Sequence, residues 1–123
     1  MAASDPRDNH RLFQDAWNAQ DVDGLLELYD EAAVYVASAQ EQLSGHAAIR
    51  KMLEEITALG AETRLELLSL TRCGDTALEK TRWTMRFPSE DAEPVEQSGF
   101  STVVLRRRPD GKWHMLIDDP GVA

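Results

Sequence analysis

The chain has 123 residues, of which 42% are hydrophobic and 28% charged, and its formal net charge is −9. This length suits one core, so we expect residues 1–123 to form a single domain. The acidic charge disfavours binding to nucleic acid or to an anionic membrane surface. The single cysteine, Cys73, excludes an internal disulfide framework. With no signal peptide and no membrane-spanning run in the sequence, we expect a cytoplasmic protein.

The first part of the chain predicts two helices. Asp5 and Pro6 are typical of a helix start, because Asp caps free N–H groups and Pro is tolerated at the first helical position. An apolar stripe follows at helical spacing, formed by Leu12, Phe13, Ala16 and Trp17. Asp21 is expected to cap a short second helix. Two large aromatic residues one turn apart indicate burial against a broad surface, such as a sheet.

A first strand and a third helix are expected next. Residues 33–37 are β-rich, and the polar residues 38–45 predict a turn and a minor strand. The third helix should start after Ser44 and end near Gly60, a good residue for a helix terminus. Its apolar residues follow the helical period and are Ile49, Met52, Leu53, Ile56 and Leu59.

From residue 61 onward, apolar and polar residues alternate as they do in strands. Short turns rich in Gly, Pro and Asp separate the alternating segments, which indicates an antiparallel meander. Helices first and strands afterwards predict an α+β fold, with the helices on one face of an antiparallel sheet. Four long strands are predicted, at residues 63–72, 76–87, 96–108 and 112–118.

Three motifs give the chain a family resemblance. They are N-A-Q-D-V-D-G-L-L-E-L-Y at residues 18–29, G-H-A-A-I-R at residues 45–50 and D-G-K-W at residues 110–113. In this order they resemble the NTF2-like superfamily, and within it the SnoaL-like and ketosteroid-isomerase-like proteins. The resemblance implies a cone, in which a curved antiparallel sheet wraps a long N-terminal helix and two further helices partly close a pocket. It also implies a homodimer formed through the convex face of the sheet.

The resemblance does not extend to the catalytic residues of the ketosteroid isomerases. Those enzymes use a general-base aspartate and an oxyanion hole made of a tyrosine and a protonated aspartate. The position of the tyrosine falls at Phe13 and that of the base at Ala37, and neither side chain can do this chemistry. The second aspartate falls at Ser101 or Thr102. We therefore do not expect a ketosteroid isomerase.

Three residues are candidates for catalysis, each with a simpler alternative. Tyr35 could donate a hydrogen bond to a ligand, or it could be a core tyrosine with its hydroxyl at the rim. Asp118 could be a general acid or base if it is desolvated, or it could belong to a solvated turn. His114 could be a base in the pocket or a surface imidazole. Glu79 shares a face with Trp83 and could reach the cavity, but an unpaired carboxylate would be costly there, so it is expected instead in water at the open end of its strand.

A wider set of residues is expected to line a pocket for a small apolar molecule, because these residues should face the interior. The set is Phe13, Trp17, Tyr35, Met52, Trp83, Met85, Thr102 and Asp118. No metal site is predicted, since no His or carboxylate group has a recognisable ligand spacing. No cofactor is expected, because no cofactor motif is visible.

Two functional hypotheses follow. The first is a protein that binds a small, largely apolar molecule and could act on it by acid–base chemistry, such as isomerisation, cyclisation or hydration. The second is a non-catalytic homodimeric module, whose cone is filled by its own side chains. An open cavity of roughly 300 Å³ or more would favour the first hypothesis, and a packed interior the second.

Overall fold

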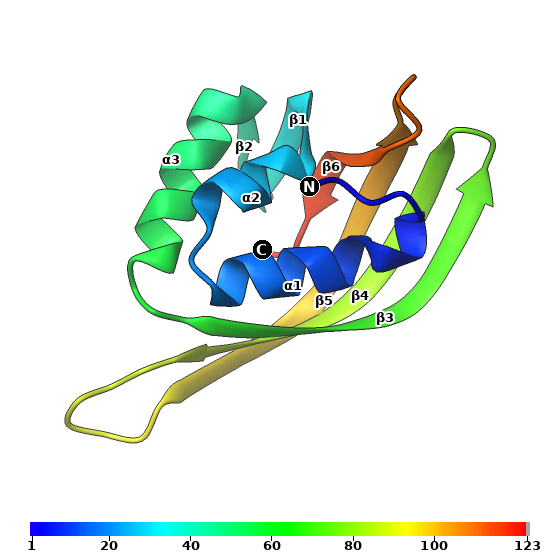
Figure 1. Ribbon diagram of the computed structural model, residues 1–123. Coiled ribbons are helices and arrows are strands. Elements are labelled where there is room, and N and C mark those ends of the chain that lie inside the picture. The colour runs from blue at the N-terminus through cyan, green and yellow to red at the C-terminus, as the bar shows by residue number, and fades with distance from the viewer. Residues whose placement is uncertain (123) are drawn as a thin grey trace.

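The computed structural model describes residues 1–122 as three α-helices, a 3₁₀ helix and six strands. The strands form one curved sheet that wraps around α1, while α2 and α3 lie at one end (Figure 1). This α+β architecture confirms the predicted fold class. In chain order the elements are η1 Pro6–Asp8, α1 Asn9–Asn18, α2 Val22–Glu27, β1 Tyr29–Ser38, β2 Glu41–Ser44, α3 Gly45–Thr57, β3 Glu62–Cys73, β4 Thr76–Phe87, β5 Val95–Arg107 and β6 Trp113–Asp119.

The sheet has the strand order β2-β1-β6-β5-β4-β3. Strands β3 to β6 form the predicted antiparallel meander. One pairing departs from the predicted antiparallel sheet, because β1 pairs with β6 in parallel. No tight turn joins these two strands, so the local sequence imposes no antiparallel pairing on them. Within the described residues, no helix is long and apolar enough to cross a membrane.

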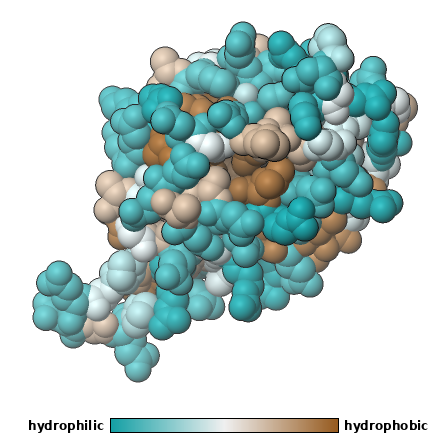
Figure 2. Space-filling model, viewed as in Figure 1, coloured by the Kyte–Doolittle hydropathy of each residue, from teal (hydrophilic) through white to brown (hydrophobic). Residues whose placement is uncertain are grey.

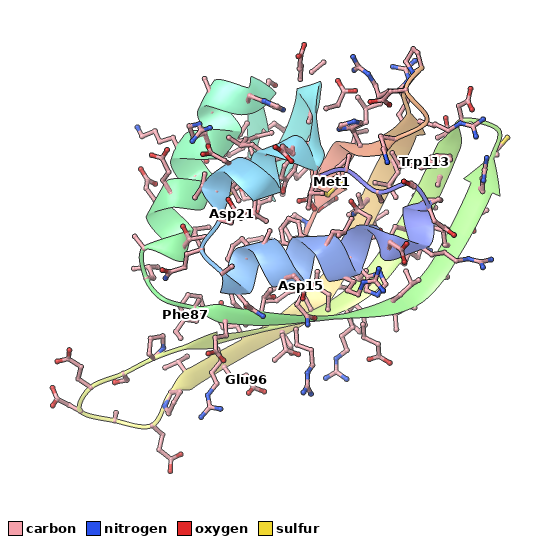
Figure 3. All side chains as sticks on the ribbon, in the orientation of Figure 1. Met1, Asp15, Asp21, Phe87, Glu96 and Trp113 are labelled. Carbon is pink, nitrogen blue, oxygen red and sulfur yellow. The ribbon has the colours of Figure 1, made fainter. Side chains whose placement is uncertain are left out.

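The helices confirm most of the predicted signals. Asp5 caps the N-terminal segment, whose first turn is a 3₁₀ turn rather than an α-helical one. The predicted apolar stripe of α1 packs into the core. Asp21 lies at the start of α2, where its side chain accepts a hydrogen bond from the Gly24 N–H at 2.9 Å (Figure 3).

Strand β4 shows the predicted division into two faces. Ala77, Glu79 and Thr81 are buried under the helices, whereas Lys80 and Arg82 are exposed on the convex side. Towards their connection, β4 and β5 project beyond the helices, and Glu96 lies on this extension (Figures 1 and 3). The tip of the extension is covered by hydrophilic residues (Figure 2).

Strand pairing aligns one row of residues across the whole sheet. Paired residues on neighbouring strands point to the same face, so the row places two carboxyl groups and a tyrosine on the concave side. From β3 to β2 the row consists of Leu70, Glu79, Val103, Asp118, Tyr35 and Leu43.

An irregularity in β6 decides which aspartate faces inward. Met115 pairs with Leu105, but Ile117 pairs with Val104, so the register shifts by one residue between them. Strict alternation from the buried Met115 would turn Ile117 inward and Asp118 outward. With the shift, Ile117 is 40% exposed and Asp118 only 6%. A β-bulge therefore turns Asp118 towards the concave face.

Candidate active site

A cavity of about 270 Å³ lies between the helices and the concave face of the sheet. Phe13 and Trp17 of α1 form one wall, and Leu53 of α3 contributes to another. Leu59 and Val122 line the cavity yet are exposed, so they mark its opening. In the space-filling view, hydrophobic side chains are visible near the middle of the molecule, surrounded by hydrophilic ones (Figure 2). The volume of this cavity lies just below the roughly 300 Å³ that would favour a ligand site, and close to the lower end of the range for ligand pockets.

The structure brings most of the sequence-predicted pocket residues together at this cavity. Those that line it are Phe13, Trp17, Tyr35, Trp83, Met85 and Asp118. They come from both sides of the cone, because α1 supplies the first two and the strands β1, β4 and β6 supply the other four. Their roles toward a ligand stay predictions.

Three of the sequence-predicted site residues lie elsewhere. Thr102 is exposed on the convex face opposite Lys80, because strand alternation gives the inward positions to its neighbours. Met52 packs against the core, whereas the next residue of α3, Leu53, reaches the cavity. His114 lines a separate polar hollow beside Asp30. The bulge in β6 lies between His114 and Asp118, so the two side chains point to different faces.

The N–H groups of the two tryptophan residues that line the cavity already donate hydrogen bonds to the protein backbone. The Trp17 Nε1–H donates to the Ala61 carbonyl at 3.0 Å, and the Trp83 Nε1–H donates to the Pro120 carbonyl at 2.9 Å. The Phe13 and Trp17 rings stack with their centroids 5.7 Å apart. These rings therefore present apolar surface to the cavity, and the hydrogen-bonding groups must come from other residues.

Asp118 is a buried carboxyl group at the cavity wall, held by a tyrosine. The Tyr29 hydroxyl donates to Asp118 Oδ2 at 2.5 Å. Burial raises the pKa of Asp118 to about 6, although the hydrogen bond from Tyr29 lowers it and nearby Asp119 raises it. Burial and Asp118 also raise the pKa of both Tyr29 and Tyr35, so the two hydroxyls stay protonated at neutral pH.

Asp118 and Tyr35 lie side by side on the concave face of the sheet. They are paired on the adjacent strands β6 and β1, so their backbones lie about 5 Å apart and their side chains leave the same face. Within residues 1–122 the only side-chain partner of the Asp118 carboxyl is Tyr29, at Oδ2, and Oδ1 has none. This leaves one oxygen able to exchange a proton with a ligand, beside a phenol that can donate a hydrogen bond.

A second buried carboxyl group, Glu79, lies on the same row. It is 2% exposed, contrary to the expectation that it would be in water. The Asn9 Nδ2–H donates to Glu79 Oε2 at 3.3 Å. Burial raises the pKa of Glu79 to about 7, and the negative charge of Asp118 adds to this rise, while the Asn9 hydrogen bond opposes it. The helices cover this part of β4. Alternation along the strand does not reveal this cover, so the sequence pattern alone could not decide whether Glu79 lies in water or in the core.

Tyr29, Glu79 and Asn9 are cavity residues that sequence reasoning did not select. Tyr29 precedes the strand predicted at residues 33–37, and the register of β1 shifts between Tyr29 and Val34, so alternation gave no signal for Tyr29. Glu79 carried a signal, since it shares a face with Trp83 in the alternating pattern of β4. Asn9 had no such signal, because a polar residue in a first helical turn is usually solvated.

The remaining candidate groups do not converge. No group of three His, Cys, Asp or Glu residues in the described part of the chain could hold a metal ion. Cys73 is exposed at the end of β3. In the basic run at residues 106–108, Arg107 pairs with Asp75 and Arg108 with Asp30, so both arginines compensate local acidic charge.

A family model described as the SnoaL-like domain matches residues 10–114. No curated protein sequence matches the chain. Among solved structures, a proposed dehydratase of the NTF2-like family from Streptomyces avermitilis is 23% identical, with a TM-score of 0.75 and coverage of 94% of this chain and 93% of that one. These matches confirm the resemblance to the NTF2-like superfamily.

Two further solved structures have the same fold. A ketosteroid isomerase-like protein from Erwinia carotovora atroseptica is 11% identical, with a TM-score of 0.80 and coverage of 92% of this chain and 89% of that one. A proposed calcium/calmodulin-dependent protein kinase type II association domain from Thiobacillus denitrificans is 16% identical, with a TM-score of 0.75 and coverage of 94% of both chains. At these identities the likeness concerns the fold alone.

Proposed function

The chain belongs to the SnoaL-like domain family, and from this premise we propose that it binds a small, largely apolar molecule in its cavity and acts on it by acid–base chemistry. Asp118 is the general acid or base, and Tyr35 donates a hydrogen bond to a ligand oxygen. Tyr29 is a positioning residue, because its hydroxyl holds one oxygen of the Asp118 carboxyl.

The observation that carries this proposal is the state of Asp118. Its carboxyl group is buried at an otherwise apolar cavity wall, and its pKa is raised to about 6. A catalytic acid or base works best when its pKa lies near the operating pH, and burial is how enzymes raise the pKa of a carboxyl group into that range. An ordinary surface aspartate is fully ionised at neutral pH and exchanges protons poorly as an acid.

Isomerisation, cyclisation, hydration and dehydration are the reaction classes that these groups support. Each needs proton transfer at carbon or oxygen, together with a hydrogen bond to an oxygen that gains negative charge. The fold relatives described as a proposed dehydratase and as ketosteroid isomerase-like are consistent with this range. No step needs a redox or group-transfer cofactor.

The proposal can be tested without knowing the substrate. Native mass spectrometry of the purified protein would detect a small molecule that co-purifies with it. A thermal-shift screen of steroids, aromatic polyketides, terpenoid epoxides and fatty acids should find compounds that raise the Tm as their concentration rises, as mass action requires. The same compounds should fail to stabilise a variant in which Leu53→Trp fills the cavity. Stabilisation that survives in this variant would place binding elsewhere.

Replacing Tyr29 by phenylalanine should raise the pKa of Asp118 further. The Tyr29 hydrogen bond favours the ionised carboxyl, so its loss shifts the titration midpoint from about 6 to a higher pH. Carboxyl-carbon NMR of the free protein can follow this titration. Tyr35→Phe is the matched control, because Tyr35 makes no hydrogen bond to Asp118 within residues 1–122, and its midpoint should stay near that of the wild type. An unchanged midpoint in Tyr29→Phe would exclude the positioning role.

A second candidate function, a homodimeric interaction module, is favoured by one surface feature. On the convex face, strand pairing aligns the apolar residues Leu78, Val104, Ile117 and Val34 across four strands. Leu78 and Ile117 are 37% and 40% exposed. A solvated sheet face normally carries polar residues, so this row is consistent with a cover provided by a second copy of the chain.

The dimer is tested by Ile117→Lys. A charge in the middle of the apolar row should convert a dimer into monomers in analytical ultracentrifugation, while the circular dichroism spectrum stays unchanged. Val95→Lys is the control, since Val95 is 56% exposed at the start of β5, away from the row. A monomeric wild-type protein at micromolar concentration would contradict the second candidate.

A further inference from the structure

The cavity contains a buried hydrogen-bond acceptor without a donor. Asn9 is 1% exposed and lines the cavity, yet its Oδ1 atom has no hydrogen-bond partner within the described residues. Its Nδ2–H group donates to Glu79 Oε2, which fixes the orientation of the amide. Buried acceptors are almost always satisfied, because a lost hydrogen bond with water is not otherwise replaced. An unsatisfied acceptor on a cavity wall therefore calls for a donor inside the cavity.

Two neighbouring groups make this end of the cavity suitable for a polar ligand atom. Glu79 contributes a buried carboxyl group beside the amide. His10, the next residue of α1, also lines the cavity. Burial lowers the pKa of His10, so the imidazole is neutral and does not attract an anion here. Asn9 Oδ1 can only accept a hydrogen bond, which favours a neutral ligand group that can donate one.

The cluster is separated from Asp118 by the width of one strand. Glu79 pairs with Val103, and Val103 pairs with Asp118, so the two carboxyl-bearing residues lie two strands apart with apolar Val103 between them. Two strand spacings correspond to about 10 Å between their backbones. The cavity thus has two polar ends, separated by an apolar middle.

We propose that Asn9 and Glu79 form a second polar subsite, which binds a hydroxyl group of the ligand at the end of the cavity opposite Asp118. The ligand is then a compact apolar molecule with an oxygen function at each end. One end reacts at Asp118 and Tyr35, and the hydroxyl at the other end donates to Asn9 Oδ1. This inference rests on the proposed function, because it concerns the same cavity.

Three compounds of one shape test the inference by isothermal titration calorimetry. They are naphthalene, β-naphthol and the naphthalenediol whose hydroxyls lie at opposite ends of the ring pair. The wild-type protein should bind the diol about tenfold more tightly than β-naphthol, since one added hydrogen bond to a buried acceptor contributes about that factor. In Asn9→Leu, which removes the acceptor, this preference should fall to within about twofold, while β-naphthol affinity is retained.

Gln42→Leu is the control, because Gln42 is exposed on β2 and does not line the cavity. Its preference for the diol should equal that of the wild type. Equal wild-type affinities for β-naphthol and the diol would overturn the second subsite while leaving the cavity as a binding site. Failure of the wild type to bind any of the three compounds would contradict both the inference and the proposed function. The comparison of ligands needs only the wild-type protein, so it stands even if Asn9→Leu does not fold.

Discussion

Asp118→Asn is expected to lower kcat by about 10²- to 10⁴-fold on the substrate class that the ligand screen identifies, the usual contribution of a general acid or base. The fold should be retained, because the asparagine carbonyl can still accept the Tyr29 hydrogen bond that Asp118 accepts at Oδ2. Only the capacity to exchange a proton is lost. In the wild type, turnover by Asp118 as a base should rise with pH around a midpoint of about 6, since its ionised form predominates above that pKa.

Asp119→Asn is the matched control for this prediction. Asp119 is the adjacent residue of β6, but its Oδ1 accepts the Gly121 N–H, and it does not line the cavity. Turnover by the Asp119→Asn variant should stay within a few fold of the wild-type value. Unchanged ligand affinity and turnover in both Asp118→Asn and Tyr35→Phe would exclude acid–base chemistry at this site. Equal losses in Asp118→Asn and Asp119→Asn would point to a general effect of charge instead.

Glu79→Gln is expected to stabilise the protein above pH 7 and to have little effect near pH 4.5. The pKa of Glu79 rises on folding from its ordinary 4.5 to about 7, so the folded state binds the proton more tightly than the unfolded chain. The stability that this proton contributes is complete below pH 4.5 and is lost as the pH rises through 7. Glutamine is uncharged throughout and avoids that loss. The difference in unfolding free energy above pH 7 can reach roughly 3 kcal/mol, or on the order of 10 °C in Tm.

Thermal unfolding of both proteins between pH 4.5 and 8 measures this difference directly. Other groups also titrate over part of this range: Asp30, for instance, has a lowered pKa, because the Ala32 N–H and Arg108 outweigh the effect of its burial. Such contributions are common to the wild type and the variant, and cancel in the comparison. Glu66→Gln, at an exposed position of β3, is the matched surface control. A constant Tm difference between Glu79→Gln and the wild type at every pH would contradict the assignment.

The proposed site differs from that of the ketosteroid isomerases in its residues as well as in its positions. Phe13 and Ser101, which occupy two of the aligned catalytic positions, line the cavity without an ionisable group. The buried carboxyl groups that line the cavity of this chain are Asp118 and Glu79, on strands β6 and β4. The shared cone therefore carries a different arrangement of titratable side chains, which is why fold resemblance leaves the reaction open.

Much of the fold was predictable because its signals are local. The apolar stripe of α1, the Asp21 cap and the alternation of β4 each depend on neighbouring residues, and each is confirmed. The short turns of the meander likewise predict which strands are neighbours. The family motifs predicted that a curved sheet wraps around α1, an arrangement that no local pattern specifies.

Residue placement at the cavity depended on features that are not local. Strict alternation in β6 groups His114 with Asp118, and the bulge after Met115 separates them. Glu79 is buried because α1 covers that part of β4, so its pKa depends on a contact with Asn9, 70 residues away in the chain. Tyr29 reaches Asp118 across 89 residues.

The amino-acid sequence by itself determined the fold class, the strand faces and an aromatic-lined interior, because periodicity and turn chemistry act over a few residues. Only the tertiary structure decided which carboxyl groups enter the cavity and with what pKa. A side chain's desolvation depends on what covers it, and the covering helix and the bulged strand come from distant parts of the chain. The chemistry proposed for Asp118 is therefore a property of the assembled cone.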